Sequence, residues 1–377
     1  MTLPSDFDQF IMKRALALAR RARGYTCPNP MVGAIVVRNG TKVGEGYHRA
    51  CGQPHAEAEA LVRAGSKARG ATIYITLEPC DHVGRTPSCT EAILTAGIKR
   101  VVTGAGDPNP KVQGKGLARL RQAGVEVVTG ILEQECRDLN RDYNHYISTG
   151  LPWVTLKWAM TLDGKIATRT GDSRWVSGEA AQRYAHRLRA KHASVLVGLG
   201  TALADDPLLT VRHVRGRQPT RIVLDGRGEL LLESRLVQSA MDVPLWVAIT
   251  QLAPEDWRWA LVDKGVKVLE IAADTHGHID IMALLCELGS REVMSLLVEG
   301  GSKTLGSFFD AGLWNQASVV IAPKLAGGKE APGPFGGKGI GKMAEVRALA
   351  DVHWRRLGDD LIIEGYNGRY NNSNKVR

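Results

Sequence analysis

The sequence predicts an α/β protein built from two consecutive domains. Its 377 residues exceed what one hydrophobic core usually organises. Patterns typical of strands and helices alternate along the chain, and the alternation starts afresh after Pro152. We therefore expect one domain over residues 1–149, a second domain over residues 150–366, and a polar, disordered tail over residues 367–377.

The first domain opens with apolar residues at helical spacing, which predict a helix that starts after Ser5 and ends at Gly24. Asn39-Gly40 favours a type I′ turn between two strands. The expected strands cover residues 32–37, 42–47, 71–77, 100–103 and 125–128, and the expected helices cover residues 55–64, 88–96, 117–123 and 132–146. This order predicts a layered α/β sandwich around a sheet that is at least partly parallel.

The second domain shows the same alternation with its own buried strands. The expected strands cover residues 153–159, 194–197, 220–224, 245–249, 266–271, 293–298 and 317–321, and the expected helices cover residues 179–191, 279–288 and 302–310. Short apolar runs separated by helical patterns are typical of parallel sheets. We therefore expect a second α/β core.

The composition indicates in which compartment the protein works and which kinds of partner it binds. No run of 18 apolar residues occurs, so we expect no membrane contact, and the N-terminus lacks an apolar signal core, so we expect a cytoplasmic protein. Its six cysteines are then expected to be thiols or metal ligands. The net charge of +10 suits nucleic acid or phosphorylated small molecules. Because the basic residues are spread along the chain, we favour small molecules and expect no nucleic-acid partner.

A zinc site is predicted by four residues of the first domain. His55-Ala-Glu57, followed by Pro79-Cys80 and by Cys89, matches the zinc-deaminase pattern of one His and two Cys ligands with a nearby Glu. Imidazole and thiolates suit Zn²⁺ rather than Mg²⁺ or Ca²⁺. Three protein ligands leave a tetrahedral position for water, which zinc makes more acidic. Glu57 is then expected to move protons between this water and a departing amine.

The spacing of the two cysteines departs from the usual pattern, in which the second follows three residues after the first. Here Cys89 follows Cys80 by nine positions. Ser88-x-x-Glu91 is a capping box, which places Cys89 at the first position of a helix, where the helix dipole stabilises a thiolate. Cys51 lies close to His55 in the sequence, but no comparable helix start presents it.

Two other functions fit part of this pattern. A deaminase acting on transfer RNA would use the shorter cysteine spacing and aromatic stacking platforms, whereas only 6% of this chain is aromatic. A non-catalytic module stabilised by zinc would need a fourth protein ligand, which His82 could supply, but Glu57 would then have no function. A catalytic zinc site accounts for more of the residues than either.

Several further motifs resemble one enzyme family. They are Pro28-Asn29-Pro30-Met31-Val32-Gly33, Gly44-Glu-Gly-Tyr-His48, the insert from Asp81 to Ser88, Leu162-Asp163-Gly164-Lys165, Ser173-Arg174-Trp175, the segment from Thr201 to Arg212, Val298-Glu299-Gly300-Gly301, and Ala322-Pro323-Lys324-Leu325. Together they resemble the bifunctional riboflavin-biosynthesis deaminase-reductases over about residues 8 to 365. The resemblance implies a cytidine-deaminase-like α/β/α sandwich followed by a dihydrofolate-reductase-like α/β domain.

The resemblance also implies two reactions on one phosphorylated pyrimidine. Zinc-dependent hydrolysis removes the 2-amino group of 2,5-diamino-6-ribosylamino-4(3H)-pyrimidinone 5′-phosphate. NADPH then reduces the ribosyl side chain, which gives 5-amino-6-ribitylaminouracil 5′-phosphate. Dimers or tetramers are common in the family, so we expect a homo-oligomer.

In the first domain, five residues are candidates for substrate binding. Asn29 suits the edge of the pyrimidine ring, His48 and His82 suit the ribose or phosphate, and Arg85 with Thr86 suits the phosphate. Each also has a simpler interpretation, such as a turn residue for Asn29 or a solvated loop charge for Arg85. Ser88 stands where the family usually has proline, which the capping box makes harmless.

In the second domain, Gly300, Gly301 and Ser302 lie between a strand and a helix, where backbone N–H groups can hold a dinucleotide phosphate. Lys303 and Thr304 would add contacts. Gly336-Gly-Lys-Gly-Ile-Gly341 is also rich in glycine, but no strand precedes it, so we do not interpret it as a dinucleotide fingerprint.

The resemblance assigns further residues of this domain. It places Ala159, Trp175, Thr201 and Asp205 at the cofactor, and Ser173, Arg189, Leu209, Arg212 and Glu299 at the substrate, with the two arginines clamping its phosphate. Lys157 and Asp205 are our candidates for the proton donor, because burial lowers the pKa of a lysine toward neutrality. Gly226 stands where a small hydroxyl residue is expected, so one cofactor contact is missing.

Overall fold

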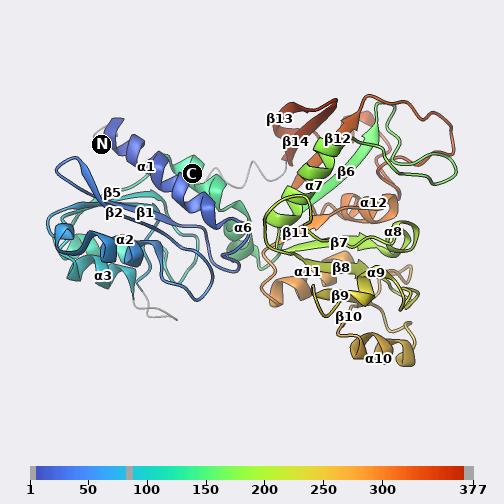
Figure 1. Ribbon diagram of the computed structural model, residues 1–377, viewed down its shortest axis with the longest axis horizontal. Coiled ribbons are helices and arrows are strands. Elements are labelled where there is room, and N and C mark those ends of the chain that lie inside the picture. The colour runs from blue at the N-terminus through green and yellow to red at the C-terminus, as the bar shows by residue number, and fades with distance from the viewer. Residues whose placement is uncertain (1–5, 82–87, 369–377) are drawn as a thin grey trace. The chain divides into compact units, whose positions relative to one another are not determined.

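The computed structural model describes residues 6–81 and 88–368, and it divides the chain into two compact units at Gly150. Each unit has its own sheet (Figure 1). Within the described ranges, no helix combines the length and the apolar character that a membrane crossing requires.

The first unit contains a five-stranded sheet in the order β2-β1-β3-β4-β5. Its strands are β1 (Gly33–Arg38), β2 (Thr41–Tyr47), β3 (Thr72–Leu77), β4 (Arg100–Ala105) and β5 (Glu126–Val128). β1 is antiparallel to β2 and β3, whereas β3, β4 and β5 are parallel, so the prediction of a partly parallel sheet is confirmed. Asn39 and Gly40 have φ angles of 48° and 74°, as the expected type I′ turn requires.

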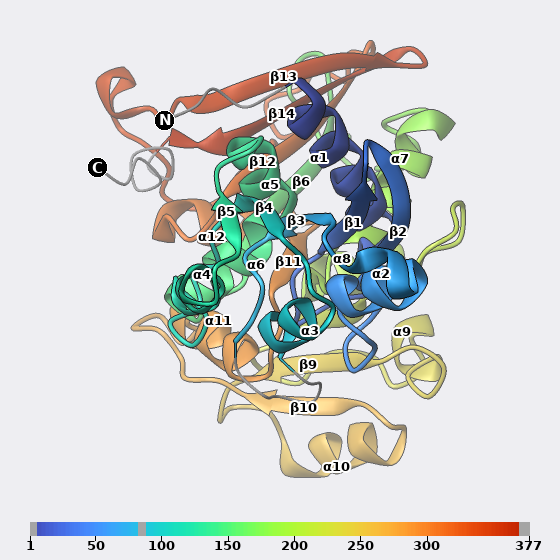
Figure 2. The same ribbon diagram turned by 90° about the vertical axis from the view of Figure 1, so that its left-hand side faces the viewer.

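Helices cover both faces of this sheet, which confirms the sandwich (Figures 1 and 2). One face carries α1 (Asp6–Ala19) and α5 (Glu133–Leu139), and the other carries α2 (Ala56–Ala64), α3 (Cys89–Thr95) and α4 (Lys115–Gln122). The chain also forms the 3-10 helices η1 (Arg20–Ala22) and η2 (Gly65–Ala68) here, and η3 (Met343–Glu345) in the second unit.

Two glycines of β2 bring α2 against the sheet. A Cβ atom at Gly44 would lie 2.2 Å from the carbonyl oxygen of Ala60, and one at Gly46 would lie 2.5 Å from that of Ala56. Both positions therefore need glycine, because any side chain would push the helix backbone away. The close contact fixes the start of α2, which carries two of the expected site residues.

The helix predicted over residues 132–146 is interrupted, so that prediction is wrong in its middle. α5 ends at Leu139 and a second helix, α6 (Arg141–Thr149), follows Asn140. The Asn140 side chain is buried, accepts a hydrogen bond from the Met31 N–H at 2.8 Å and donates one to the Met31 carbonyl at 2.9 Å. This pairing stabilises the loop before β1 and explains the break.

The second unit contains a nine-stranded sheet in the order β10-β9-β8-β7-β11-β6-β12-β14-β13 (Figure 1). Its strands are β6 (Trp153–Thr161), β7 (Ser194–Gly198), β8 (Thr220–Leu224), β9 (Leu245–Ile249), β10 (Lys267–Glu270), β11 (Ser295–Val298), β12 (Gln316–Ala322), β13 (Leu349–Leu357) and β14 (Asp360–Asn367). Neighbouring strands from β10 to β12 are parallel, and β14 and β13 continue the sheet as an antiparallel hairpin.

Each predicted strand and helix of this unit is present, but several elements were not predicted. These are β13, β14, α8 (Leu199–Asp205), α9 (Arg235–Gln238) and α10 (Glu255–Asp263). The start of the polar tail also needs correction, because Asn367 belongs to β14 and its buried side chain donates a hydrogen bond to the carbonyl of Trp314 at 3.1 Å.

Two hydrophobic cores lie on the two faces of this sheet. α7 (Glu179–Lys191), α8, α9 and α10 pack on one face, and α11 (Ile281–Ser290) and α12 (Ser302–Ala311) pack on the other. In such a sheet the carboxyl ends of the parallel strands meet at one edge, where ligands bind. The loops after β6, β7, β8 and β11 therefore share one edge of the second unit.

Candidate zinc centre and reductase cavity

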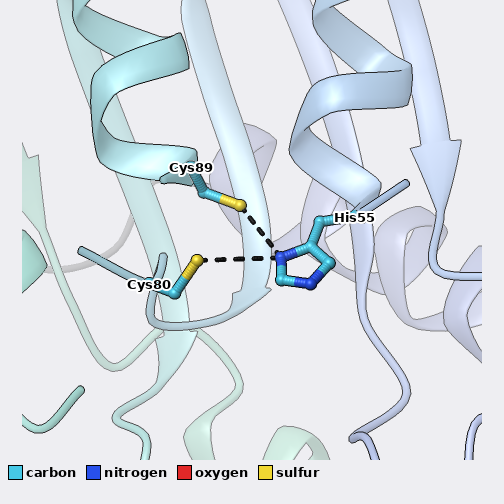
Figure 3. A group of neighbouring side chains, drawn as sticks. All are labelled: His55, Cys80 and Cys89. Atoms are coloured by element: carbon cyan, nitrogen blue, oxygen red, sulfur yellow. Dashed lines mark hydrogen bonds between the residues drawn. The ribbon is translucent and has the colours of Figure 1, made fainter. Parts of the chain in front are cut away.

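Three potential metal ligands converge in the first unit (Figure 3). The Nδ1 atom of His55 lies 3.2 Å from the Cys89 sulfur and 3.7 Å from the Cys80 sulfur, and the three atoms lie within 4.8 Å of one another. Ligands at about 2.0–2.3 Å from a tetrahedral zinc ion are separated by distances of this size. The donor set therefore fits Zn²⁺, and Cys51 is not part of it.

Local structure explains why these residues meet. His55 is the N-cap of α2, Cys80 follows the end of β3, and Cys89 is the first residue of α3. The Ser88 hydroxyl accepts a hydrogen bond from the Glu91 N–H at 3.3 Å, which confirms the predicted helix start. Two helix N-termini thus point at the ligand atoms, and both favour negative charge there.

The electrostatics of the group favour the thiolate form of one cysteine, Cys80. Hydrogen bonds from Cys89 and His55, opposed by burial, lower the pKa of the Cys80 thiol to about 4, whereas the hydrogen bond to Cys80 together with burial raises the pKa of Cys89. Glu57 is buried beside Cys89, at the second position of α2. Burial raises the pKa of its carboxyl to about 6, which suits a group that both accepts and donates a proton.

Asn29 and His48 lie next to the ligands. The His48 ring meets the His55 ring edge to face at 5.3 Å. Because His48 Nδ1 lies 3.1 Å from the Pro54 carbonyl, Nδ1 carries the proton, and Nε2 accepts a hydrogen bond from the Asn29 amide at 3.1 Å. Burial lowers the pKa of His48, which keeps this neutral form. The arrangement fixes the orientation of the Asn29 amide.

The remaining candidates of this unit, His82, Arg85 and Thr86, lie outside the described residues. The sequence analysis did not predict a second polar group at the carboxyl ends of β3 and β4. There the buried Glu78 carboxylate accepts a long hydrogen bond from the Asp107 N–H at 3.5 Å, and Asp107 accepts one from the Tyr143 hydroxyl at 3.0 Å. The parallel pairing of the two strands brings these residues together, which no local motif indicates.

A cavity of about 1830 Å³ lies within the second unit, along the carboxyl edge of the sheet. Every candidate of this domain lines it: Lys157, Ala159, Ser173, Trp175, Arg189, Thr201, Asp205, Leu209, Arg212, Glu299, Gly300, Gly301, Ser302, Lys303 and Thr304. The structure therefore brings together residues that are up to 147 positions apart in the sequence (304 − 157).

A buried ionic group forms the floor beside β6 and β11. The Arg189 guanidinium donates two hydrogen bonds to the Glu299 carboxylate, at 2.6 and 2.9 Å, and the Lys157 ammonium lies 3.8 Å from it. Burial acts to raise the pKa of Glu299, but Arg189 and Lys157 outweigh it and lower the pKa to about 2. Burial lowers the pKa of Lys157, against the opposite effect of Glu299.

The structure differs from the expected phosphate clamp in one respect. Arg189 pairs with Glu299 and also donates a hydrogen bond to the Thr210 carbonyl at 3.2 Å. Its guanidinium donors are therefore used within the protein and not on a substrate phosphate. Arg212 is exposed and uses one nitrogen on the Thr210 hydroxyl, which leaves it available to an anion. Leu209 is buried and has a φ angle of 53°, so the chain turns there, directly before the segment with Thr210 and Arg212.

The start of α12 lines the same cavity. Gly300 has a φ angle of 123°, a conformation that side chains disfavour, and a Cβ atom at Gly301 would lie 3.0 Å from the Thr201 hydroxyl. Nearby, the Ser173 hydroxyl lies 3.4 Å from the Asp205 carboxylate, and the Trp175 carbonyl accepts a hydrogen bond from Lys324 at 2.7 Å. The bare backbone at the N-terminus of α12 suits the phosphates of a dinucleotide such as NADPH.

Sequence reasoning missed several residues that line the same cavity. They are His186, Asp225, Arg227, Asp274 and His276, among others. His186 is buried, and its Nδ1 atom accepts a hydrogen bond from the Arg212 N–H at 3.0 Å. Its position three residues before Arg189 on α7 was the available signal, since such residues share a helix face. The others lie on turns that only the strand order brings to the cavity.

Comparison with known proteins finds a family model that matches each unit. Residues 5–105 match the model of the cytidine and deoxycytidylate deaminase zinc-binding region, and residues 152–363 match that of the RibD C-terminal domain. The riboflavin biosynthesis protein RibD of Aquifex aeolicus is 45% identical over 95% of this chain and 98% of its own. The RibD protein of Escherichia coli strain K12 is 40% identical over 94% of this chain and 98% of its own.

Solved structures show the same likeness. A RibD structure from Acinetobacter baumannii has a TM-score of 0.87 and 37% identity, and covers 96% of this chain and 99% of its own. A diaminohydroxyphosphoribosylaminopyrimidine deaminase/5-amino-6-(5-phosphoribosylamino)uracil reductase from Thermotoga maritima has a TM-score of 0.84 and 35% identity over the same shares. The chain thus pairs a cytidine-deaminase-like unit with a dihydrofolate-reductase-like unit, and it belongs to the RibD family of bifunctional, zinc- and NADPH-dependent deaminase-reductases of riboflavin biosynthesis.

Proposed function

We propose that the first unit removes the 2-amino group of 2,5-diamino-6-ribosylamino-4(3H)-pyrimidinone 5′-phosphate and that His55, Cys80 and Cys89 hold the zinc ion. The observation that carries this proposal is the convergence of these three ligand atoms beside the buried Glu57. Bound there, zinc would supply a Lewis acid that makes a water molecule more nucleophilic.

Glu57 has the proton-transfer role. Its carboxylate accepts a proton from water as the oxygen attacks the ring carbon, and it returns a proton to the nitrogen that leaves as ammonia. Asn29, which His48 orients, binds the edge of the pyrimidine ring. The atoms balance, since one water is consumed, one ring carbonyl forms and one ammonia leaves.

The second unit reduces the ribosyl side chain of the deaminated product. Gly300, Gly301 and Ser302 would hold the diphosphate of NADPH, and Ala159 and Trp175 would hold its nicotinamide, which would supply the hydride. Lys157 donates the proton that accompanies the hydride. Glu299 holds this lysine in place, and Arg212 binds the substrate phosphate.

Removal of zinc tests the first step. We expect a strong chelator to abolish ammonia release from the diaminopyrimidinone phosphate, and added Zn²⁺ to restore it. Reduction of the deaminated compound by NADPH should continue throughout. Ammonia release that persists in metal-free protein would refute the assignment.

A homo-oligomer in the cytoplasm completes the proposal. β13 is the edge strand of the second sheet, and Val352 and Trp354 on it are exposed, as are Met343 and Val346 before it. An exposed apolar edge of this kind is typical of a subunit interface. All six cysteines lie in the described ranges and none forms a disulfide there, which suits a reducing compartment. Light scattering should show an oligomer for the native chain and a smaller species for Trp354→Glu.

A further inference from the structure

The reductase cavity extends along the sheet well beyond Lys157, to which we assign proton transfer, and Glu299, which holds it in place. Lys157 lies in the middle of β6 and Glu299 directly follows β11, whereas the cavity continues past β7 to the turn after β8 and the loop between β10 and α11. Because β11 and β7 lie between β6 and β8, this far end is remote from the expected position of the nicotinamide. Its lining includes Arg227 and His276, which have no role in the chemistry described above.

The turn after β8 is rigidly built. The buried Asp225 carboxylate accepts hydrogen bonds from the N–H groups of Gly228, Glu229 and Leu230 at 2.7–3.0 Å. The Gly226 carbonyl accepts two more from Thr250, through its hydroxyl at 2.6 Å and its N–H at 3.1 Å. These internal contacts fix the backbone from which the side chains of Arg227 and Glu229 project.

Arg227 is the cationic side chain of this turn. It is exposed and lines the cavity, and among the described residues no hydrogen bond, ion pair or ring contact engages its guanidinium. Two other carboxylates at this end are engaged elsewhere: Asp274 accepts hydrogen bonds from the N–H groups of His276 and His278 at 2.8 and 2.9 Å, and Asp280 caps α11 through Ala283 at 2.8 Å. The Glu229 carboxylate also lines the cavity, and among the described residues no ion pair joins it to Arg227. This end of the cavity therefore offers a free cation to an anionic ligand.

The expected direction of a bound dinucleotide indicates which of its anionic groups would reach Arg227. With the diphosphate at the start of α12 and the nicotinamide toward β6, the adenosine half extends toward β8. We propose that Arg227 binds the 2′-phosphate of the adenosine ribose, so that the turn after β8 determines the preference for NADPH over NADH. This inference rests on the proposed function, which gives the position of the diphosphate. A guanidinium suits a phosphate monoester, because its parallel N–H groups match two phosphate oxygens.

Calorimetric titration of the full chain tests this directly, with NADP⁺, NAD⁺ and 2′,5′-ADP as probes. We expect Arg227→Gln to raise the dissociation constants of NADP⁺ and 2′,5′-ADP by about tenfold or more, because it removes a charge-assisted pair of hydrogen bonds. The dissociation constant of NAD⁺ should not change. Arg227→Lys should retain part of the discrimination, because it keeps the charge without the parallel donors.

Arg215→Gln is the matched control, since Arg215 is an exposed arginine of the same unit outside the cavity. It should leave all three dissociation constants unchanged. The inference is wrong if Arg227→Gln leaves the affinity for NADP⁺ unchanged, or weakens NADP⁺ and NAD⁺ equally. A native chain that binds neither dinucleotide would instead refute the proposed reductase function, and the inference with it.

Discussion

Glu57 is the residue whose role separates catalysis from structural zinc binding. It is buried at the start of α2 beside the Cys89 sulfur. We expect Glu57→Gln to lower the deamination rate by about 10²- to 10⁴-fold, because it removes proton transfer, while the zinc content stays that of the native protein. Glu59→Gln is the matched control, because Glu59 lies on the same helix but pairs with Arg49 and Arg63. If Glu57→Gln and the native protein deaminate at equal rates, Glu57 has no part in catalysis and the zinc ion has a purely structural role.

Lys157 is the corresponding residue of the reductase. Its ammonium is buried 3.8 Å from the Glu299 carboxylate. We expect Lys157→Met to lower the reduction rate by about 10²-fold or more and to leave the dissociation constant of NADP⁺ unchanged, because the lysine donates a proton and does not hold the cofactor. Stopped-flow measurement of NADPH oxidation checks this. If Lys157→Met turns over normally and Asp205→Asn does not, Asp205 is the proton donor.

The metal ligands were predictable from the sequence because each belongs to a short local pattern. His55 and Cys89 occupy helix starts that their neighbours identify, and Cys80 directly follows a strand. Arg189 shows the limit of such reasoning. Its residue type suggested a phosphate contact, but its partner Glu299 lies 110 positions away, and only the fold reveals the pair.

At the scale of elements, the same pair connects α7 to the loop after β11 and makes stability depend on pH. The pKa of Glu299 is lowered to about 2 in the folded chain from an ordinary value of 4.5. Its contribution, on the order of 3 kcal/mol, is therefore complete above about pH 5 and is lost as the pH falls toward 2. Urea unfolding of native protein and Glu299→Gln should show a stability difference that shrinks between about pH 5 and pH 3. A constant difference would contradict the ion pair.

The contact between β2 and α2 couples stability to zinc binding. A Cβ atom at Gly46 would lie 2.5 Å from the Ala56 carbonyl, next to His55. We expect Gly46→Ala to cost about 1–3 kcal/mol of stability and to weaken zinc retention in competition with a chelator, because the helix must move. Gly341→Ala is the control, since no atom lies within 4 Å of its added carbon. Normal zinc retention in Gly46→Ala would show that α2 does not need this contact.

Element prediction failed where distant contacts override local pattern. The helix over residues 132–146 breaks because Asn140 pairs with Met31, 109 positions earlier. The β13–β14 hairpin was missed because most of β13 is exposed and lacks the apolar alternation of a half-buried strand. The parallel strands were predictable, since their buried apolar runs are strong local signals.

At the scale of the whole molecule, each unit contains its own complete site. The zinc group lies within Met1–Gly150, and the reductase cavity lies within Leu151–Arg377. The two reactions are therefore expected to be chemically separable, although the product of the first is the substrate of the second. Loss of one site should leave the other fully active on its own substrate.

The most direct test of the zinc assignment follows NADPH oxidation in Cys89→Ser from two starting compounds. From the diaminopyrimidinone phosphate, the variant should oxidise no NADPH, because no deaminated product forms. From the deaminated compound, it should oxidise NADPH at the native rate. Normal oxidation from the diaminopyrimidinone phosphate would contradict the account, because deamination would then not need the third zinc ligand.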